Sequence, residues 1–248
     1  MLRRGYQAAR RGPSRTVIET GNPLNFASQG LRCWVRDDAG IALNGSTVSQ
    51  WSDQSGAGNH WPQATATRQP TYGGPGDGVD FDGADTALTG PTLSGLISAS
   101  AFTVFVVFSA DTVSTNGANT WQNSALIGQP SAFFGIHLKS APNANVFNWD
   151  GSDDKATGAI ALMTRTILTA RHGSGNLGMR VNNGAEATAA SGDTTVLSGA
   201  TEMGRGNNSD VVCYDGKIYE VVFFNTHLPD ADQALIRAYL AARNRVTL

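Results

Sequence analysis

The sequence predicts an all-β protein in which two antiparallel sheets form a sandwich. The chain has 29 glycines in 248 residues and only 15% charged residues, a composition that favours short strands and turns over long helices. Apolar runs of strand length recur along the chain and are separated by turn residues. The run at 102–108 carries apolar side chains on both faces of a strand, so both faces are expected to be covered.

The strands follow one another from Leu31 onward, with turns between them. The glycines and proline of 72–78 interrupt any regular ladder and predict a loop before a strand at 79–81. Further strands are expected over 102–108, 125–128, 132–138, 145–149, 164–172, 178–181, 202–204 and 217–225, with a tight turn at 182–184. A helix is expected near the end, where Asp230 can cap a stretch that has apolar residues at helical spacing.

Length and composition indicate one large β domain, which we place at 27–248. Residues 2–13 contain arginines and a proline where a signal peptide would have an apolar run, so we expect no signal peptide. No apolar run has the roughly 20 residues that a membrane helix needs. Cys33 and Cys213 cannot form a disulfide framework; they lie in strand-like runs near opposite ends of the domain and are expected to be buried free thiols.

Residues 1–26 are predicted to form an extended basic arm. This segment has glycines and prolines, no sustained hydrophobic period and one glutamate among its charged residues. Its positive charges come from Arg3, Arg4, Arg10, Arg11 and Arg15. The arm is interpreted as an attachment element for an acidic surface or for phosphates; the alternative is a solvated tail.

The stretch 48–61 joins a strand-like run to a tight turn between two tryptophans. Asp53 and Asn59 can bond backbone N–H groups and hold such a turn. Trp51 and Trp61 can each bury a large apolar area. Two interpretations stay open: a structural corner, or a glycan or metal loop formed by Asp53, Asn59 and an aromatic platform.

The sequence shows no recognisable catalytic or metal motif. The four glutamates are far apart in sequence, so the acid pair of a glycosidase is absent, and we expect the chain not to be an enzyme. Asp80 and Asp82 share one strand face, but they precede a glycine turn and are interpreted as structural. With Asp85 they resemble the start of a calcium loop without its later bidentate glutamate, so we expect no cofactor, with a structural calcium as the alternative. The G-x-G-x-x-G at 173–178 precedes a strand and predicts a hairpin loop.

Three motifs resemble the LamG-like, concanavalin A-like lectin/glucanase family. They are Leu31-Arg32-Cys33-Trp34-Val35-Arg36-Asp37-Asp38, then Trp51-Ser52-Asp53-Gln54-Ser55-Gly56-Ala57-Gly58-Asn59, and Val79-Asp80-Phe81-Asp82-Gly83. The segment 215–225, followed by a short helix, is similar to the end of such domains. The resemblance covers about 31–243 and implies a jelly-roll sandwich. It is moderately specific for the fold and poorly specific for function.

Domains of this type resemble structural proteins of tailed-phage virions. The resemblance implies a non-enzymatic virion protein, either capsid-decorating, head-fibre or tail-associated, made in the host cytoplasm and attached through its arm to other virion proteins. The alternative is a carbohydrate-binding module for a cell-surface glycan; a glycoside hydrolase is the third hypothesis. Neither membrane nor nucleic-acid binding is expected. The two-sided apolar strands further suggest a homo-oligomer, with a trimer preferred.

Overall fold

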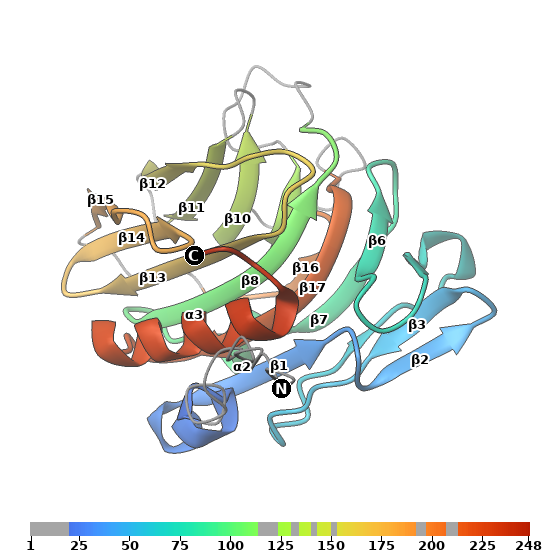
Figure 1. Cartoon of the computed structure of the whole chain (residues 1–248), viewed down its shortest axis with the longest axis horizontal. Coiled ribbons are helices and arrows are strands. Elements are labelled where there is room, and N and C mark those ends of the chain that lie inside the picture. Colours follow the sequence, from blue (N-terminus) through green and yellow to red (C-terminus); the bar gives the residue numbers. More distant parts are fainter. Residues whose placement is uncertain are drawn as a thin grey trace, which may run out of the picture.

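The protein is a sandwich of two antiparallel sheets with one long helix on the outer face of the larger sheet (Figure 1). This computed structural model describes residues 20–113, 124–129, 134–139, 143–149, 153–191, 197–206 and 213–248. The predicted all-β sandwich with a helix near its C-terminus is confirmed, and it is consistent with a jelly roll. The five arginines assigned to the arm lie outside the described residues.

The larger sheet carries its strands in the order β15-β14-β13-β8-β17-β6-β5-β3-β2, and two further strands join at its side, β1 beside β17 and β4 beside β3. Its strands are β1 (Leu31–Arg36), β2 (Ile41–Asn44), β3 (Thr47–Trp51), β4 (Trp61–Pro62), β5 (Thr71–Tyr72), β6 (Val79–Asp82), β8 (Phe102–Ala110), β13 (Thr166–Gly173), β14 (Asn176–Val181), β15 (Ala187–Ala190) and β17 (Asp215–Phe224).

The smaller sheet has the order β12-β11-β10-β9-β16-β7. Its strands are β7 (Leu88–Thr92), β9 (Ala125–Gly128), β10 (Phe134–Lys139), β11 (Asn143–Trp149), β12 (Asp153–Ala159) and β16 (Ala200–Met203). Short helical segments join the strands: η1 (Pro23–Gln29), η2 (Ala66–Arg68) and α2 (Leu93–Leu96). The main core lies between the two sheets.

The central strand β8 separates two hydrophobic clusters. Its even-numbered apolar side chains, such as Phe102 and Val104, belong to the core between the sheets. Phe105 and Val107 point to the other face and join a second cluster. All nine residues of β8 are buried within the single chain. The prediction that both faces are covered is therefore confirmed without a neighbouring subunit.

Helix α3 (Asp230–Asn244) supplies most of the cover on the outer face. Ile236, Tyr239 and Leu240 pack in the second cluster, as their helical spacing predicts. Pro229 occupies the N-cap, and Asp230 begins the first turn instead of capping it, so the predicted capping role is wrong by one position. Acidic residues in that turn still complement the helix dipole.

The first and the last strand of the sandwich, β1 and β17, pair with each other. Strand β1 runs antiparallel to β17, with Cys33 opposite Phe223. Cys213 lies beyond the opposite end of β17, where it forms an isolated bridge with Arg205. Both thiols are buried and are not joined in a disulfide, and they lie far apart along the strand. The last residues assigned to the arm are part of the packed domain, because Phe26 in η1 is buried in the second cluster.

Candidate functional site

The tryptophan corner is packed inside the sandwich. Trp51 and Trp61 are both fully buried and pair across β3 and β4. Trp51 Nε1 donates to the Arg36 carbonyl at 2.9 Å, and Trp61 stacks on Phe223 with 6.2 Å between ring centroids. Neither ring is available as a platform for a sugar. This geometry favours the structural corner over the glycan or metal loop.

Asp53 uses both carboxylate oxygens to hold the turn between the tryptophans. Oδ1 accepts from the backbone N–H groups of Trp34 and Ser55, each at 2.8 Å. Oδ2 accepts from the Ser55 hydroxyl at 2.7 Å and from Asn59 N at 3.1 Å. The Asn59 side chain in turn donates to the Arg32 carbonyl at 2.6 Å. These contacts give Asp53 and Asn59 a role in the chain's own architecture.

Among the residues that the structure describes, no three histidine, cysteine, aspartate or glutamate side chains are placed together to hold a metal ion. Asp82 Oδ1 instead accepts from the backbone N–H groups of Ala84, Asp85 and Thr86, which closes the turn after β6.

In the same described ranges, no helix has the length and apolar character needed to cross a bilayer.

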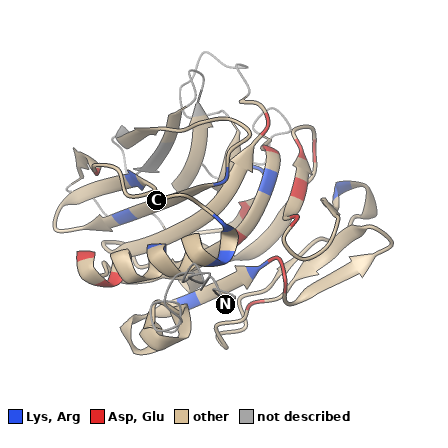
Figure 2. Cartoon of the chain, in the orientation of Figure 1, with Lys and Arg blue, Asp and Glu red and all other residues tan. Residues whose placement is uncertain are grey.

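Acidic side chains gather on the outer face of the larger sheet. Val79 and Phe81 of β6 are buried in the core, so Asp80 and Asp82 point outward. Asp82 pairs with Asp215 of β17 across the ladder, which places their side chains on one face. Asp111, just after β8, donates its N–H to the Asp215 carbonyl. Figure 2 shows acidic residues on these neighbouring strands.

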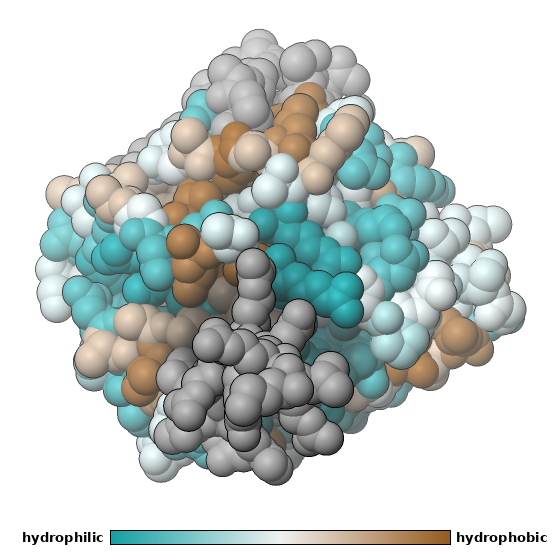
Figure 3. Space-filling model, viewed as in Figure 1, coloured by the Kyte–Doolittle hydropathy of each residue, from teal (hydrophilic) through white to brown (hydrophobic). Residues whose placement is uncertain are grey.

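These side chains border a cavity of about 420 Å³, which we call the acidic groove. Besides the four aspartates, its polar walls consist of Thr47, Thr67, Gln69, Thr71 and Thr86. Figure 3 shows hydrophilic surface over β6 and β17 on this face. The groove combines acceptors that carry charge with neutral groups that can donate or accept.

The aspartates of the groove differ in their electrostatic surroundings. Burial raises the pKa of Asp80; Lys217 opposes this, while the charges of Asp111 and Asp215 add to it. Asp82 has the opposite shift. Although burial acts against it, the hydrogen bonds from Ala84 and from other groups of its own turn hold the pKa of Asp82 below its ordinary value. The pKa values of these two carboxyls on one strand face are thus shifted in opposite directions.

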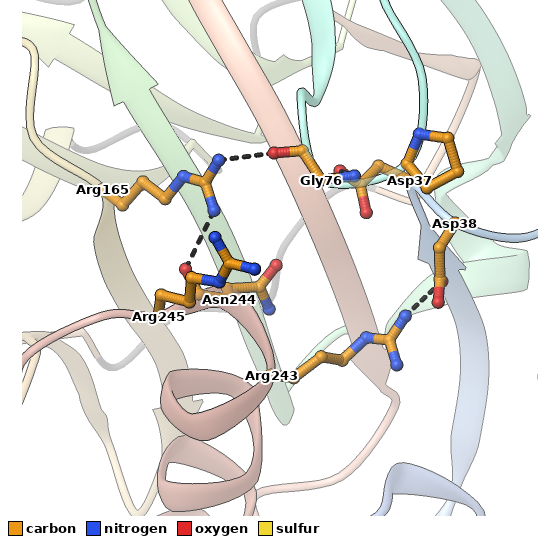
Figure 4. A pocket seen from close by; sticks show the side chains of 8 residues that line it. Asp37, Asp38, Gly76, Arg165, Arg243, Asn244 and Arg245 are labelled. Carbon is orange, nitrogen blue, oxygen red and sulfur yellow. Dashed lines mark hydrogen bonds and ion pairs between the residues drawn. The ribbon is translucent and has the colours of Figure 1, made fainter.

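A second cavity of about 320 Å³ lies between the end of α3 and the turns at 37–38 and 75–76; we call it the arginine pocket (Figure 4). Arg243 forms ion pairs with Asp38 and with buried Glu220. Arg165 donates to the Asn244 carbonyl at 3.1 Å and to the Gly76 carbonyl. Arg245 completes the lining and ends α3.

Most of these residues could not be identified as neighbours from the sequence. Alternation along β6 places Asp80 and Asp82 on one face, but only the β6–β17 register and the β8–β17 pairing bring Asp215 and Asp111 beside them. Arg165 is about 80 residues from the arginines of α3. Partners that distant are joined by the topology of the sandwich, which periodicity in one sequence does not reveal.

Neither a family model nor a curated protein matches this sequence. Solved structures do resemble the fold. Trypanosoma rangeli sialidase superposes with a TM-score of 0.59 at 14% identity, over 94% of this chain and 39% of the sialidase. Domain 4 of AbnA, a GH43 extracellular arabinanase from Geobacillus stearothermophilus solved with arabinotriose, gives 0.54 at 15%, over 85% of this chain and 98% of that domain.

The K499G mutant of NanB sialidase from Streptococcus pneumoniae gives a TM-score of 0.50 at 19% identity, over 64% of this chain and 27% of that one. The chain thus spans well under half the length of the sialidases. These comparisons contradict the predicted non-enzymatic phage virion protein, because the similar structures are sialidases and an arabinanase domain. At such low identity the likeness establishes a shared β-sandwich fold. It does not assign an activity to this chain.

Proposed function

We propose that this chain is a carbohydrate-binding β-sandwich domain whose glycan lies in the acidic groove. The observation that carries the proposal is the lining of that groove, where carboxylates, threonine hydroxyls and the Gln69 amide surround one cavity. The likeness to the arabinanase domain supports it, since that domain was solved with arabinotriose and almost its whole length matches this fold.

The chemistry of the groove suits the hydroxyl groups of a neutral sugar. A sugar hydroxyl can donate to an aspartate and accept from a threonine hydroxyl such as that of Thr67 or Thr71, so each ring can satisfy several polar groups at once. Hydrogen bonds to a charged acceptor are shorter and stronger than neutral ones. Four aspartates in one cavity would repel a carboxylate-bearing sugar, which favours a neutral glycan.

The test is the affinity of the full chain for neutral oligosaccharides, with arabinotriose as the first probe, measured by calorimetry. Asp80→Asn keeps the side-chain shape but removes the charged acceptor. The expected loss is about 1.5–3 kcal/mol of binding free energy, or roughly 10- to 150-fold in Kd. Asp85→Asn is the matched control, because Asp85 follows the same strand but does not line the groove.

Two outcomes bear on the proposal. Saturable binding that Asp80→Asn weakens and Asp85→Asn preserves supports it. Failure of a broad panel of neutral glycans to bind at millimolar concentration contradicts it, as does binding whose affinity is unchanged in Asp80→Asn.

Glycoside hydrolysis in the same groove is a second candidate. The specific observation is the pair Asp80 and Asp82, whose pKa values shift in opposite directions on one strand face. Such divergence is how one carboxyl can serve as general acid while its neighbour stays ionised. Release of reducing ends from an oligosaccharide, lost in both Asp80→Asn and Asp82→Asn, would support hydrolysis; binding without any release would contradict it.

The finer classification of the domain also belongs to this proposal. The motifs at 31–38, 51–59 and 79–83 suggest that the sandwich is of the LamG-like, concanavalin A-like kind. A homo-oligomer, which the sequence suggested, stays a prediction. Its original reason is weaker, because α3 already covers the outer face of β8.

A further inference from the structure

We propose that the arginine pocket is a second binding site, for the carboxylate of an acidic saccharide. The proposal rests on the proposed function in taking the ligand to be a carbohydrate. It concerns a different cavity from the acidic groove and the opposite charge preference. Its main support is that two guanidinium groups, those of Arg165 and Arg245, face the cavity without a carboxylate partner among the described residues.

The acidic side chains of the pocket are already engaged. The Asp37 carboxylate accepts from the backbone N–H groups of Gly76 at 2.9 Å and Gly78 at 3.1 Å. Asp38 pairs with Arg36 at 3.3 Å and with Arg243. Arg243 also contacts Glu220 at 3.1 Å. Both acidic side chains that line the pocket therefore have partners within the chain.

Arg165 is held rigidly at the wall of the pocket and remains uncompensated in charge. Its guanidinium donates to two backbone carbonyls, of Asn244 and of Gly76, and lies over the Tyr219 ring at 4.1 Å from the centroid. None of these described partners is a carboxylate. A guanidinium fixed in this way loses little conformational entropy when an anion arrives.

Arg245 supplies the second guanidinium and does so from an unfavourable backbone position. It ends α3 in the left-handed conformation, at φ 57°, where glycine is the usual residue. The side chain is exposed, and Figure 4 shows its guanidinium directed into the pocket beside Asn244. A planar fork of N–H donors matches the two oxygens of a carboxylate.

The pocket also suits the remainder of a sugar ring. Its volume of about 320 Å³ is at the lower end of small-ligand sites. Both ion pairs of Asp38 involve Oδ1, so its Oδ2 at the border of the pocket can accept from a ring hydroxyl. A carboxylate on Arg245 and Arg165 with a hydroxyl on Asp38 would use both the charge and the shape of the cavity.

The experiment compares D-glucuronate with D-glucose, which differ by the carboxylate, in NMR titrations of the full chain. We expect glucuronate to bind at least tenfold more tightly than glucose at this site and to weaken as salt is raised. Arg245→Gly should abolish this preference while keeping or raising the melting temperature, because glycine relieves the left-handed strain. A loss of binding in this variant therefore cannot be attributed to unfolding.

Two further variants sharpen the result. Arg245→Lys retains the charge without the fork and should bind with intermediate affinity. Arg180→Gln removes one positive charge from β14, away from the pocket lining, and should bind like the unmodified chain. Equal affinity for the two sugars, or an effect of Arg180→Gln equal to that of Arg245→Gly, overturns the proposal.

Acetate separates a saccharide site from a simple anion site. If acetate binds as tightly as glucuronate, the saccharide part of the inference is wrong. The groove proposal fails independently: arabinotriose binding would then be absent or insensitive to Asp80→Asn, while the glucuronate preference at Arg245 would remain.

Discussion

The two tryptophans of the corner illustrate how burial decides the role of a residue. Trp51 and Trp61 are aromatic residues of the kind that can stack on a sugar ring, yet both are fully buried. Their indole N–H groups have partners within the chain, the Arg36 carbonyl and Cys33 Sγ. Their large apolar area stabilises the packing of β3 and β4 against the core.

Replacing Trp51 by alanine should lower the free energy of unfolding by about 3–5 kcal/mol, through lost transfer energy and the cavity that remains. Chemical denaturation measures this loss. Below its own unfolding transition, Trp51→Ala should still bind the groove ligand of the unmodified chain. Unchanged stability with lost glycan binding would instead make the ring a sugar contact.

At this scale the sequence predicted the side chains that a local rule can place. Strand alternation correctly put Asp80 and Asp82 on one face, and turn chemistry correctly identified Asp53 as a residue that bonds backbone N–H groups. Asp111 and Asp215 were not identified, because their approach depends on strand register between segments about 100 residues apart.

Among the elements, β17 connects the core with the outer face. It lies between β8 and β6 and also pairs with β1. Its buried Glu220 joins three elements: Oε1 accepts from Trp34 Nε1 at 2.7 Å, and Oε2 accepts from Asn244 Nδ2 at 2.7 Å and contacts Arg243. This carboxylate therefore holds α3 against β1 and β17.

Glu220→Ala should destabilise the domain by about 3–5 kcal/mol, because it leaves the buried donors of Trp34 and Asn244 and the charge of Arg243 without their partner. Thermal and denaturant unfolding check this. Glu220→Gln is the matched control, since it keeps the shape and an acceptor and should cost less. Equal losses in the two variants would show that the charge is what matters.

The unmodified chain and Glu220→Gln also give a pH test. Burial raises the pKa of Glu220 above its ordinary value, against the opposing effect of Arg243. A carboxyl whose pKa is higher in the folded state contributes full stability below its unfolded pKa and loses it as pH rises through the folded pKa. The unmodified chain should therefore lose stability relative to Glu220→Gln from acidic toward neutral pH; the reverse trend would contradict the assignment.

The elements most accessible to sequence analysis were those with a strong apolar pattern. The strand at 102–108 was predicted because it is a nearly continuous run of aromatic and β-branched residues, and the helix after Leu228 because its apolar residues recur at a period of about 3.6. The two-residue strands β4 and β5 were not predicted, since a pair of residues has no period and exists as a strand only through its neighbours.

At the scale of the whole molecule, both proposed sites, the acidic groove and the arginine pocket, lie on the outer face of the larger sheet, beside α3. Asp215 borders the acidic groove, and Tyr219, four residues along β17, supports Arg165 in the arginine pocket. At about 3.3 Å per residue this separation is roughly 13 Å. One face thus offers an acidic and a basic cavity side by side, which would let a single domain distinguish neutral from charged parts of a glycan.

The most direct test of the central claim is to map where a neutral glycan binds, by NMR chemical-shift perturbation of the full chain during an arabinotriose titration. We predict saturable shifts in the backbone amides of Thr71, Asp82, Asp111 and Asp215, around the acidic groove, and small shifts at the tryptophan corner. Saturable shifts confined to another face of the sandwich, with the groove amides unmoved, would contradict the account.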